Sequence, residues 1–322
     1  MRYLQRRDVQ SPDKKNMILG IDVGGTTVKF AGVTLEGKVI DKQAFDTHAW
    51  EDSAQLFVDK LSEIILRYIA KHNIEGVGIG LPGLLSQDRQ STHVLANIPI
   101  LNNQKFVPMV QEKIKGIPVQ IENDAKCAAL GEMYFGENAN CGDYLFISIG
   151  TGVGGGYVLN GKLFIGSSGN ATEIGHIPLK DGVTLEDHIG QEKITAHTYD
   201  LLKTKKYKQS ILQGKELDPK IIYNAALSSD SCALDVFAEV GECIGETMIG
   251  VMRFADIHRF ILGGGVAGAF EFIAPAMEGY LKNHLDSYYT EDLDIRPASL
   301  NAEAGILGAA SLVMDKLKQV TA

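Results

Sequence analysis

The chain has 322 residues, of which 45% are hydrophobic, and its formal net charge at pH 7 is −9. This length is enough for two domains, and the composition is that of an ordinary globular protein. An acidic chain lacks the basic surface that nucleic acids and anionic membranes attract, so we expect neither as a partner.

Several further features of the composition favour a cytoplasmic location. The four cysteines form no C-x-x-C pair, and a chain of this size does not need disulfides to hold a core. No apolar stretch reaches the length needed to span a bilayer. Residues 1–16 are polar and basic without an apolar centre, so we interpret them as an N-terminal extension and not as a signal peptide.

Strands and helices are predicted to alternate along the chain. Apolar alternation and glycine-containing turns predict strands, and Leu and Ile at helical spacing predict helices. In chain order, strands are expected at 17–23, 28–34 and 38–45, a helix at 54–70, a strand at 75–80, a helix at 106–115 and a strand at 117–122. A helix from Asp124 follows, then a strand at 144–149, a helix at 233–255, a strand at 259–262, and helices at 270–285 and 302–318.

The pattern of the first strands returns in the second half of the chain. Residues 18–40 run strand, glycine loop, strand, tight turn, strand, and residues 144–166 do the same, with LEGK in one turn and LNGK in the other. Such a repeat predicts a duplicated α/β fold that holds a ligand between its two copies.

Three glycine clusters stand at predicted strand ends. The first lies within one hairpin and comprises Asp22, Gly24, Gly25, Thr26, Thr27 and Lys29. The others comprise Gly150, Thr151 and Gly152, and Gly263, Gly264 and Gly265. Glycines let backbone N–H groups approach an anion closely, and threonine and lysine add donors. One such cluster is more often a plain tight turn, but three together indicate a nucleotide site, although no G-x-x-x-x-G-K-[ST] loop is present.

Six motifs occur in the order seen in the ROK family, which the chain therefore resembles. That family comprises repressors, uncharacterised open reading frames and sugar kinases. The six motifs are DVGGTTVK (22–29), GLPG (80–83), END (122–124), GTGVGGG (150–156), EIGH (173–176) and LGGGV (262–266). The resemblance implies the duplicated actin-like, ribonuclease H-like ATPase fold, with two domains and a cleft between them. It also implies a small α/β domain of residues 17–124 plus about 303–322, a large α/β domain of residues 125–302, and a homodimer.

By this resemblance, the protein uses ATP and Mg²⁺ to phosphorylate a hexose, and glucose is expected to become glucose 6-phosphate. Fructose, mannose or N-acetylmannosamine remain alternative sugars, and polyphosphate remains an alternative donor. A sugar-responsive repressor is the rival from another class. Such repressors carry a helix-turn-helix domain before the first glycine loop, whereas only sixteen residues precede Met17 here, so we expect the enzyme.

The resemblance assigns Asp124 as the general base that takes the proton from the attacking sugar hydroxyl. A modest base suffices, because the alcohol becomes acidic only as it bonds to phosphorus. An aspartate before a helix is ordinarily a cap, and this simpler role is compatible with the catalytic one. The adjacent Asn123 resembles the family's sugar-binding amide.

Further sugar contacts are also implied by the resemblance. Glu173 and His176 resemble residues that grip sugar hydroxyls, and Glu186 resembles the glutamate that holds the anomeric side of the ring. Asn97 resembles the polar contact that follows the G-x-P-G turn, with Asn102 and Asn103 as competitors. Gly83 is expected to bring its backbone close to the sugar.

One departure from the family lies between His176 and Glu186. Most relatives carry a C-x-C-G-x-x-G-C zinc motif there, whereas this chain has IPLKDGVTL. We therefore expect no structural zinc and assign no metal ligand. A site made from His176 with nearby acidic residues and His188 is the alternative.

Overall fold

The computed structural model describes residues 16–321, and side chains up to Met314. Residues 1–15 of the polar extension lie outside the described residues. The described chain forms two five-stranded sheets and one two-stranded sheet. The first sheet contains β1 (Asn16–Val23), β2 (Thr27–Thr34), β3 (Val39–Asp46), β4 (Asn73–Leu81) and β7 (Val119–Asn123). The second contains β8 (Tyr144–Ile149), β9 (Val153–Leu159), β10 (Lys162–Phe164), β11 (Arg259–Gly263) and β12 (Asp294–Pro297), and the small sheet contains β5 (Leu84–Leu85) and β6 (Thr92–Val94).

The two large sheets share one topology. Their strand orders are β3-β2-β1-β4-β7 and β10-β9-β8-β11-β12. In each sheet, the first strand in sequence pairs antiparallel with the second and parallel with a strand that follows a crossover. The repeat predicted from residues 18–40 and 144–166 is thereby confirmed as a repeated topology.

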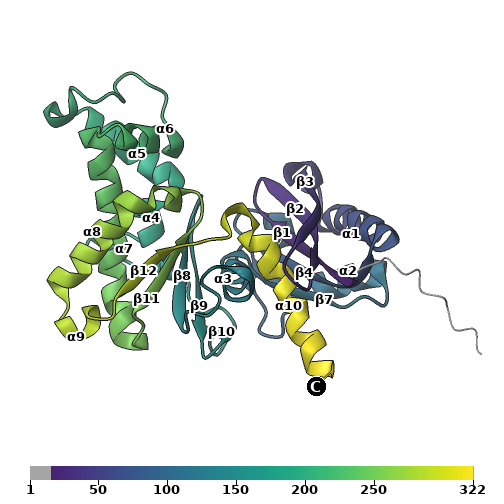
Figure 1. Ribbon diagram of the computed structural model, residues 1–322. Helices are drawn as coiled ribbons and strands as arrows, with labels where there is room; N and C mark the ends of the chain where they lie inside the picture. Colours follow the sequence, from purple (N-terminus) through teal and green to yellow (C-terminus); the bar gives the residue numbers. More distant parts are fainter. Residues whose placement is uncertain (1–15, 322) are drawn as a thin grey trace, which may run out of the picture.

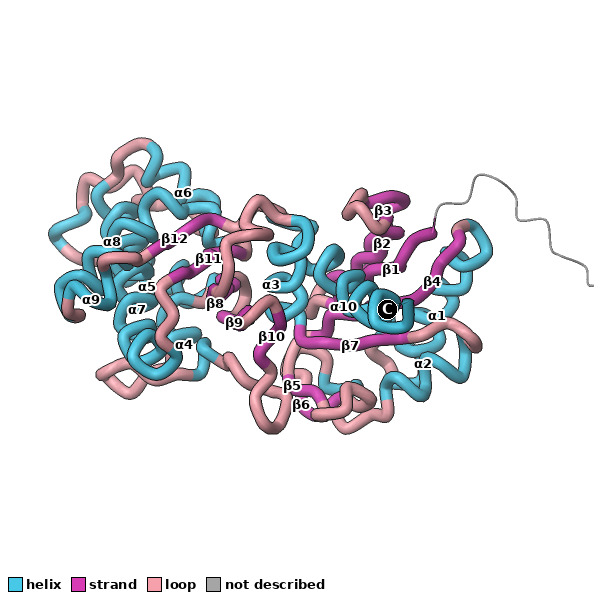
Figure 2. The backbone as a smooth tube through the Cα atoms, turned by 60° about the horizontal axis from the view of Figure 1, so that its bottom comes forward, coloured by secondary structure: helices cyan, strands magenta, loops and turns pink. Residues whose placement is uncertain are grey.

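Helices cover both faces of the two sheets. They are α1 (Ala54–Lys71), α2 (Phe106–Ile114), α3 (Asp124–Phe135), α4 (Leu185–Ile189), α5 (Gln191–Leu202), α6 (Pro219–Leu227), α7 (Ser231–Ala255), α8 (Phe270–His284), α9 (Ser287–Thr290) and α10 (Ala304–Thr321). In Figure 1, α3 and α10 lie between the two sheets, and α3 contacts strands of both. In Figure 2, α1 and α2 lie on the far side of the first sheet from α10. Helices α7 and α8 pack on the outer side of the second sheet.

None of the described helices is long and apolar enough to cross a membrane.

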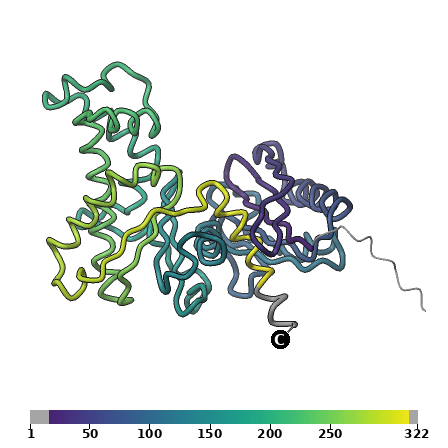
Figure 3. The backbone as a smooth tube through the Cα atoms, in the orientation of Figure 1, coloured from purple at the N-terminus to yellow at the C-terminus, as the bar shows by residue number. Residues whose placement is uncertain are grey.

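The last helix returns to the first strands of the chain. Figure 3 follows this return, in which the yellow C-terminal segment comes to lie beside the purple N-terminal strands. Two glycines permit the close approach, because a Cβ at Gly20 would overlap the carbonyl oxygen of Ile306, and one at Gly78 would overlap that of Ala309. Side chains alternate along a strand, so Asp22 shares the inner face of β1 with Gly20.

The predicted elements are largely confirmed, and the misses are short or weakly patterned. The second half contains α4, α5, α6 and β12, which the sequence did not predict. Helix α4 has only five residues, and β12 is an edge strand whose residues are mostly half-buried, so neither carries a clear apolar period. The domain boundaries expected from the sequence stay a prediction.

Candidate active site

Asp124 stands where β7 passes directly into α3. Asn123, and not Asp124, caps this helix, because its side-chain oxygen accepts a hydrogen bond from the backbone N–H of Lys126 at 3.1 Å. The capping role considered for Asp124 therefore belongs to its neighbour. Asp124 is the first helical residue, and its Oδ1 accepts a hydrogen bond from the N–H of Ala125 at 2.8 Å.

The surroundings of Asp124 disfavour its charged form. Burial is the largest cause and the charge of Asp22 is the next, and together they raise the pKa of Asp124 from 3.8 to about 7. The charge of Glu173 acts in the same direction, whereas the Ala125 hydrogen bond and Lys126 oppose it. A carboxylate with a pKa near neutrality can accept a proton at physiological pH and hold it.

Asp124 lines a cavity of about 670 Å³ to which both sheets contribute. Asp22 and Lys29 come from the first sheet, and their side chains form an ion pair of 3.0 Å. Six of the residues predicted from the sequence meet here: Asp22, Lys29, Asp124, Gly263, Gly264 and Gly265.

The glycines after β11 form one wall of the cavity. Gly264 has a φ of +86°, and a Cβ there would overlap the backbone of Ile149, so the turn requires glycine. Gly265 differs, since a Cβ there would meet nothing within 4 Å. Ser148 and Phe270 also line the cavity, and the sequence analysis missed both. Neither belongs to a glycine cluster, so no local signal marked them.

The other predicted loop residues have structural contacts of their own. The N–H of Gly24 donates to the carbonyl of Thr27 at 3.0 Å, and the N–H of Gly150 donates to that of Gly152 at 2.8 Å. Both bonds close tight turns. The described lining of the cavity does not include Gly24, Gly25, Thr26, Thr27, Gly150, Thr151 or Gly152. Their contact with phosphate therefore stays a prediction.

The G-x-P-G turn lies against the cap of α3. Gly83 has a φ of +107°, a Cβ there would overlap the carbonyl of Val94, and its own carbonyl accepts a hydrogen bond from Nδ2 of Asn123 at 3.3 Å. Asn97 is exposed and its side chain lies beside Gly25 of the first loop. Asn102, an alternative candidate for this sugar contact, already has a hydrogen-bond partner within the protein. Its Oδ1 accepts a hydrogen bond from the N–H of Leu95 at 2.7 Å.

Glu173, His176 and Glu186 lie around the second glycine loop. Oε2 of Glu186 accepts a hydrogen bond from the N–H of Val153 at 2.7 Å. His176 is exposed, and within the described chain its ring makes no recorded hydrogen bond to another residue. Oε1 of Glu173 lies 3.4 Å from Nζ of Lys126, a partner that the sequence analysis missed.

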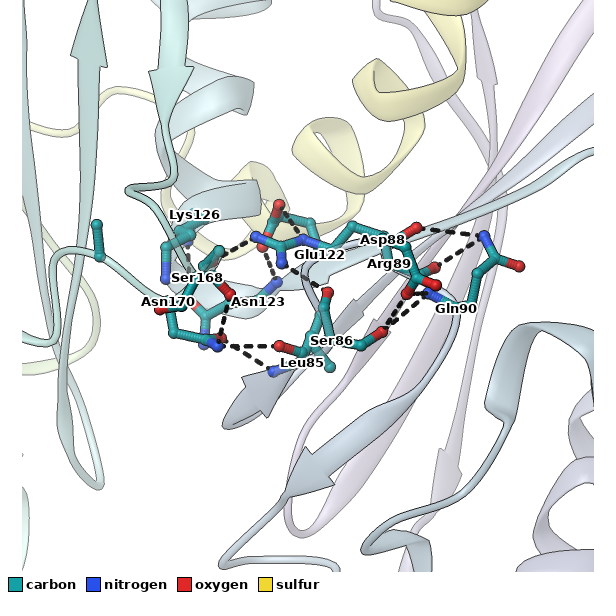
Figure 4. Close-up of polar contacts among 12 residues, drawn as sticks. Leu85, Ser86, Asp88, Arg89, Gln90, Glu122, Asn123, Lys126, Ser168 and Asn170 are labelled. Atoms are coloured by element: carbon teal, nitrogen blue, oxygen red, sulfur yellow. Dashed lines mark hydrogen bonds and ion pairs between the residues drawn. The ribbon is translucent and has the colours of Figure 1, made fainter.

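Glu122 forms hydrogen bonds that hold the segments around the β7–α3 junction together. Its Oε2 accepts a hydrogen bond from Nε of Arg89 at 2.8 Å, and its Oε1 accepts one from the N–H of Asn123 at 2.8 Å. Arg89 also donates to the carbonyl of Gly169, so it joins the β5–β6 hairpin to the segment after β10 (Figure 4). Arg89 is 33 residues from Glu122, and no motif linked them.

In the part of the chain that the structure describes, no three His, Cys, Asp or Glu side chains are grouped to hold a metal ion. The expectation about zinc stays a prediction.

The chain matches the ROK family over residues 18–316 and belongs to it. It is similar to a glucokinase from Halalkalibacterium halodurans, at 30% identity over 92% of this chain and 94% of that protein. It is also similar to an N-acetyl-D-glucosamine kinase from Histophilus somni, at 28% identity over 93% of this chain and 100% of that protein.

The fold matches those of solved structures, and two of them illustrate the similarity. A proposed sugar kinase from Cytophaga hutchinsonii has a TM-score of 0.87 at 43% identity, and the match covers 92% of this chain and 99% of that one. A ROK family glucokinase from Streptomyces griseus, in complex with glucose and AMPPNP, has a TM-score of 0.77 at 26% identity, with 92% and 98% covered. Together with the repeated strand order, these matches confirm the duplicated actin-like, ribonuclease H-like fold.

Proposed function

We propose that this protein is an ATP-dependent sugar kinase in which Asp124 is the general base, and that glucose is its substrate and glucose 6-phosphate its product. One observation carries the proposal. A carboxylate whose pKa is raised to about 7 lines a cavity that the first sheet and the glycine turn after β11 also line. The glucokinase relatives support the choice of glucose.

The cavity suits a nucleotide. Gly265 offers backbone with open space above it, Lys29 offers a cation, and Phe270 offers an aromatic side chain. Asp22 is the cavity carboxylate that would face Mg²⁺. When bound, ATP supplies the phosphoryl group and Mg²⁺ neutralises its negative charge.

The protein's own part in the reaction is to place the sugar and to move one proton. Asp124 accepts the proton from the attacking hydroxyl, which leaves the electron pair on that oxygen for the bond to phosphorus. Hydroxyls both donate and accept hydrogen bonds, so carboxylates, amides and an imidazole suit them. The proposed sugar contacts are Gly83, Asn97, Asn123, Glu173, His176 and Glu186. The proposed phosphate contacts in the other loops are Gly24, Gly25, Thr26, Thr27, Gly150, Thr151 and Gly152.

N-acetylglucosamine is a second candidate sugar, because one relative is an N-acetyl-D-glucosamine kinase. Fructose, mannose and N-acetylmannosamine are further alternatives, as is polyphosphate in place of ATP. A homodimer and a cytoplasmic location are also proposed, on the strength of the family resemblance.

A coupled assay of ADP release tests the proposal. The purified protein is offered Mg²⁺, ATP and one sugar at a time from a panel of glucose, mannose, fructose, N-acetylglucosamine and N-acetylmannosamine. We expect sugar-dependent ADP release, with glucose giving the highest kcat/KM. Nucleotide hydrolysis that no sugar stimulates would contradict the kinase, and a preference for another sugar would contradict only the choice of glucose.

A further inference from the structure

A buried lysine lies two residues after the proposed base. The side chain of Lys126 is 1% exposed, although it belongs to the first turn of α3. An ammonium group loses its hydration when it is buried, and it opposes the partial positive charge at a helix N-terminus. Neither the packing nor the helix therefore favours lysine at this position.

The partner of Lys126 explains its presence. Nζ lies 3.4 Å from Oε1 of Glu173, which comes from the segment that precedes His176. The side chain of Glu173 is 33% exposed, so the pair has a buried cation and a carboxylate that still reaches solvent. Lys126 contacts Oε1, and Oε2 makes no hydrogen bond to another described residue.

The charges around Asp124 are arranged in separate pairs. Glu122 pairs with Arg89 on one side of the β7–α3 junction, and Glu173 pairs with Lys126 on the other. Within residues 16–314, Asp124 forms no ion pair and no hydrogen bond to another side chain, and its Oδ1 accepts only from the backbone N–H of Ala125. Figure 4 shows Arg89 with Glu122, and Lys126 near Asn123. Each cation is thus paired with a neighbouring carboxylate, and neither cation forms an ion pair with Asp124.

We propose that Lys126 is a positioning residue that orients the Glu173 carboxylate against the hydroxyls of the bound sugar. The inference rests on the proposed function, since it takes Glu173 as a sugar contact. Lys126 acts through Glu173 and touches neither the sugar nor the nucleotide. It therefore governs the affinity for sugar more than the rate of proton transfer.

Removal of the charge at Lys126 provides the test. Lys126→Met keeps an unbranched apolar stem in the buried space, and Glu173 can rehydrate because it is partly exposed, so we expect the fold to survive. The Kd for the sugar, from titration calorimetry, and its KM should rise about tenfold, the scale of a lost hydrogen bond to a charged group. The value of kcat should change by less than about threefold. Lys126→Arg keeps the charge and should recover most of the affinity.

A double-mutant cycle shows whether Lys126 acts through its partner. Glu173→Gln alone should also raise the Kd, and Lys126→Met added to it should cost little more, because the carboxylate to be positioned is already lost. Unchanged sugar affinity in Lys126→Met, or additive losses in the double variant, would overturn the inference.

The same titrations separate this inference from the proposed function. Sugar binding by the unaltered protein without ADP release would overturn the kinase and leave the role of Lys126 open to the same measurement. A protein that binds no hexose at all would overturn both.

Discussion

The side chain of Asn123 joins the start of α3 to the turn at Gly83. Its Oδ1 accepts a hydrogen bond from the N–H of Lys126 at 3.1 Å, and its Nδ2 donates one to the carbonyl of Gly83 at 3.3 Å. Asn123 is 8% exposed, so both bonds are shielded from water. The position of Asp124 is thereby fixed from the residue before it.

Asn123→Ala should lower the free energy of unfolding by about 1–2 kcal/mol, because the helix loses its cap. Denaturant unfolding of the two proteins measures this difference. Asn123→Ser is the matched control, since its hydroxyl oxygen can still accept a hydrogen bond from the N–H of Lys126 without placing a charge beside the carbonyl of Gly83, so it should lose less stability. Equal losses in the two variants would show that the cap contributes little.

Activity should depend on pH through Asp124. The base accepts a proton only when ionised, and its pKa is raised to about 7, so kcat/KM should increase as pH rises through about 7. The profile is measured with both substrates below their KM values. An acid limb near pH 4, the range of an ordinary aspartate, would contradict this assignment.

The charge of Asp22 should affect the pH at which the acid limb of the kcat/KM profile lies. Its negative charge is the second cause of the raised pKa of Asp124, so Asp22→Asn should shift the limb toward lower pH even if total activity falls. A measurement of this variant at a single pH would not distinguish a shift of the acid limb from a general loss of activity. A limb that stays in place would show that the charge of Asp22 does not raise the pKa of Asp124.

Removal of one partner of the Arg89–Glu122 ion pair should destabilise the protein. Their side chains are 13% and 6% exposed and their charges meet at 2.8 Å, so Glu122→Gln should lower the free energy of unfolding by about 3 kcal/mol. Arg89→Met should cost less in this background than it costs alone, because there it removes a cation that has already lost its carboxylate partner. Additive losses in a double-mutant cycle would contradict a direct coupling of the two residues.

Gly265 offers a clean test of the nucleotide site. Its backbone is in the ordinary helical region and a Cβ meets nothing within 4 Å, so Gly265→Val should fold normally while its side chain enters the cavity. Affinity for Mg²⁺ and ATP, from calorimetry, should fall at least about tenfold. Gly279→Val, at an equally open position of α8 outside this cavity, serves as the control. Equal affinities in both variants would place the nucleotide elsewhere.

Strongly patterned features of the fold were predictable from the sequence. The strand at 144–149 has the predicted bounds and the next helix back along the chain begins at Asp124 as predicted, because an apolar run marks the strand and a polar junction marks the helix start. The repeat of the strand–loop–strand unit indicated the duplication. Helices α4 to α6 were missed because short or mixed segments derive their structure from packing rather than from local pattern.

The partners of the site residues were harder to predict. Local spacing identified Asp124 and the glycine turns, but Arg89 and Lys126 reach Glu122 and Glu173 across 33 and 47 residues of sequence. Only the fold brings such pairs together. Asn123, and not Asp124, is the N-cap residue because Asp124 is already the first residue of the helix.

The turnover of Asp124→Asn tests the central claim most directly. Asparagine keeps an oxygen that can accept the hydrogen bond from Ala125, and the cap at Asn123 is untouched, so the fold should be preserved. We expect kcat for the preferred hexose to fall by at least about 10²-fold, with the sugar Kd within about threefold of the original value. A variant that retains more than about half of the turnover would contradict the assignment of Asp124 as the general base.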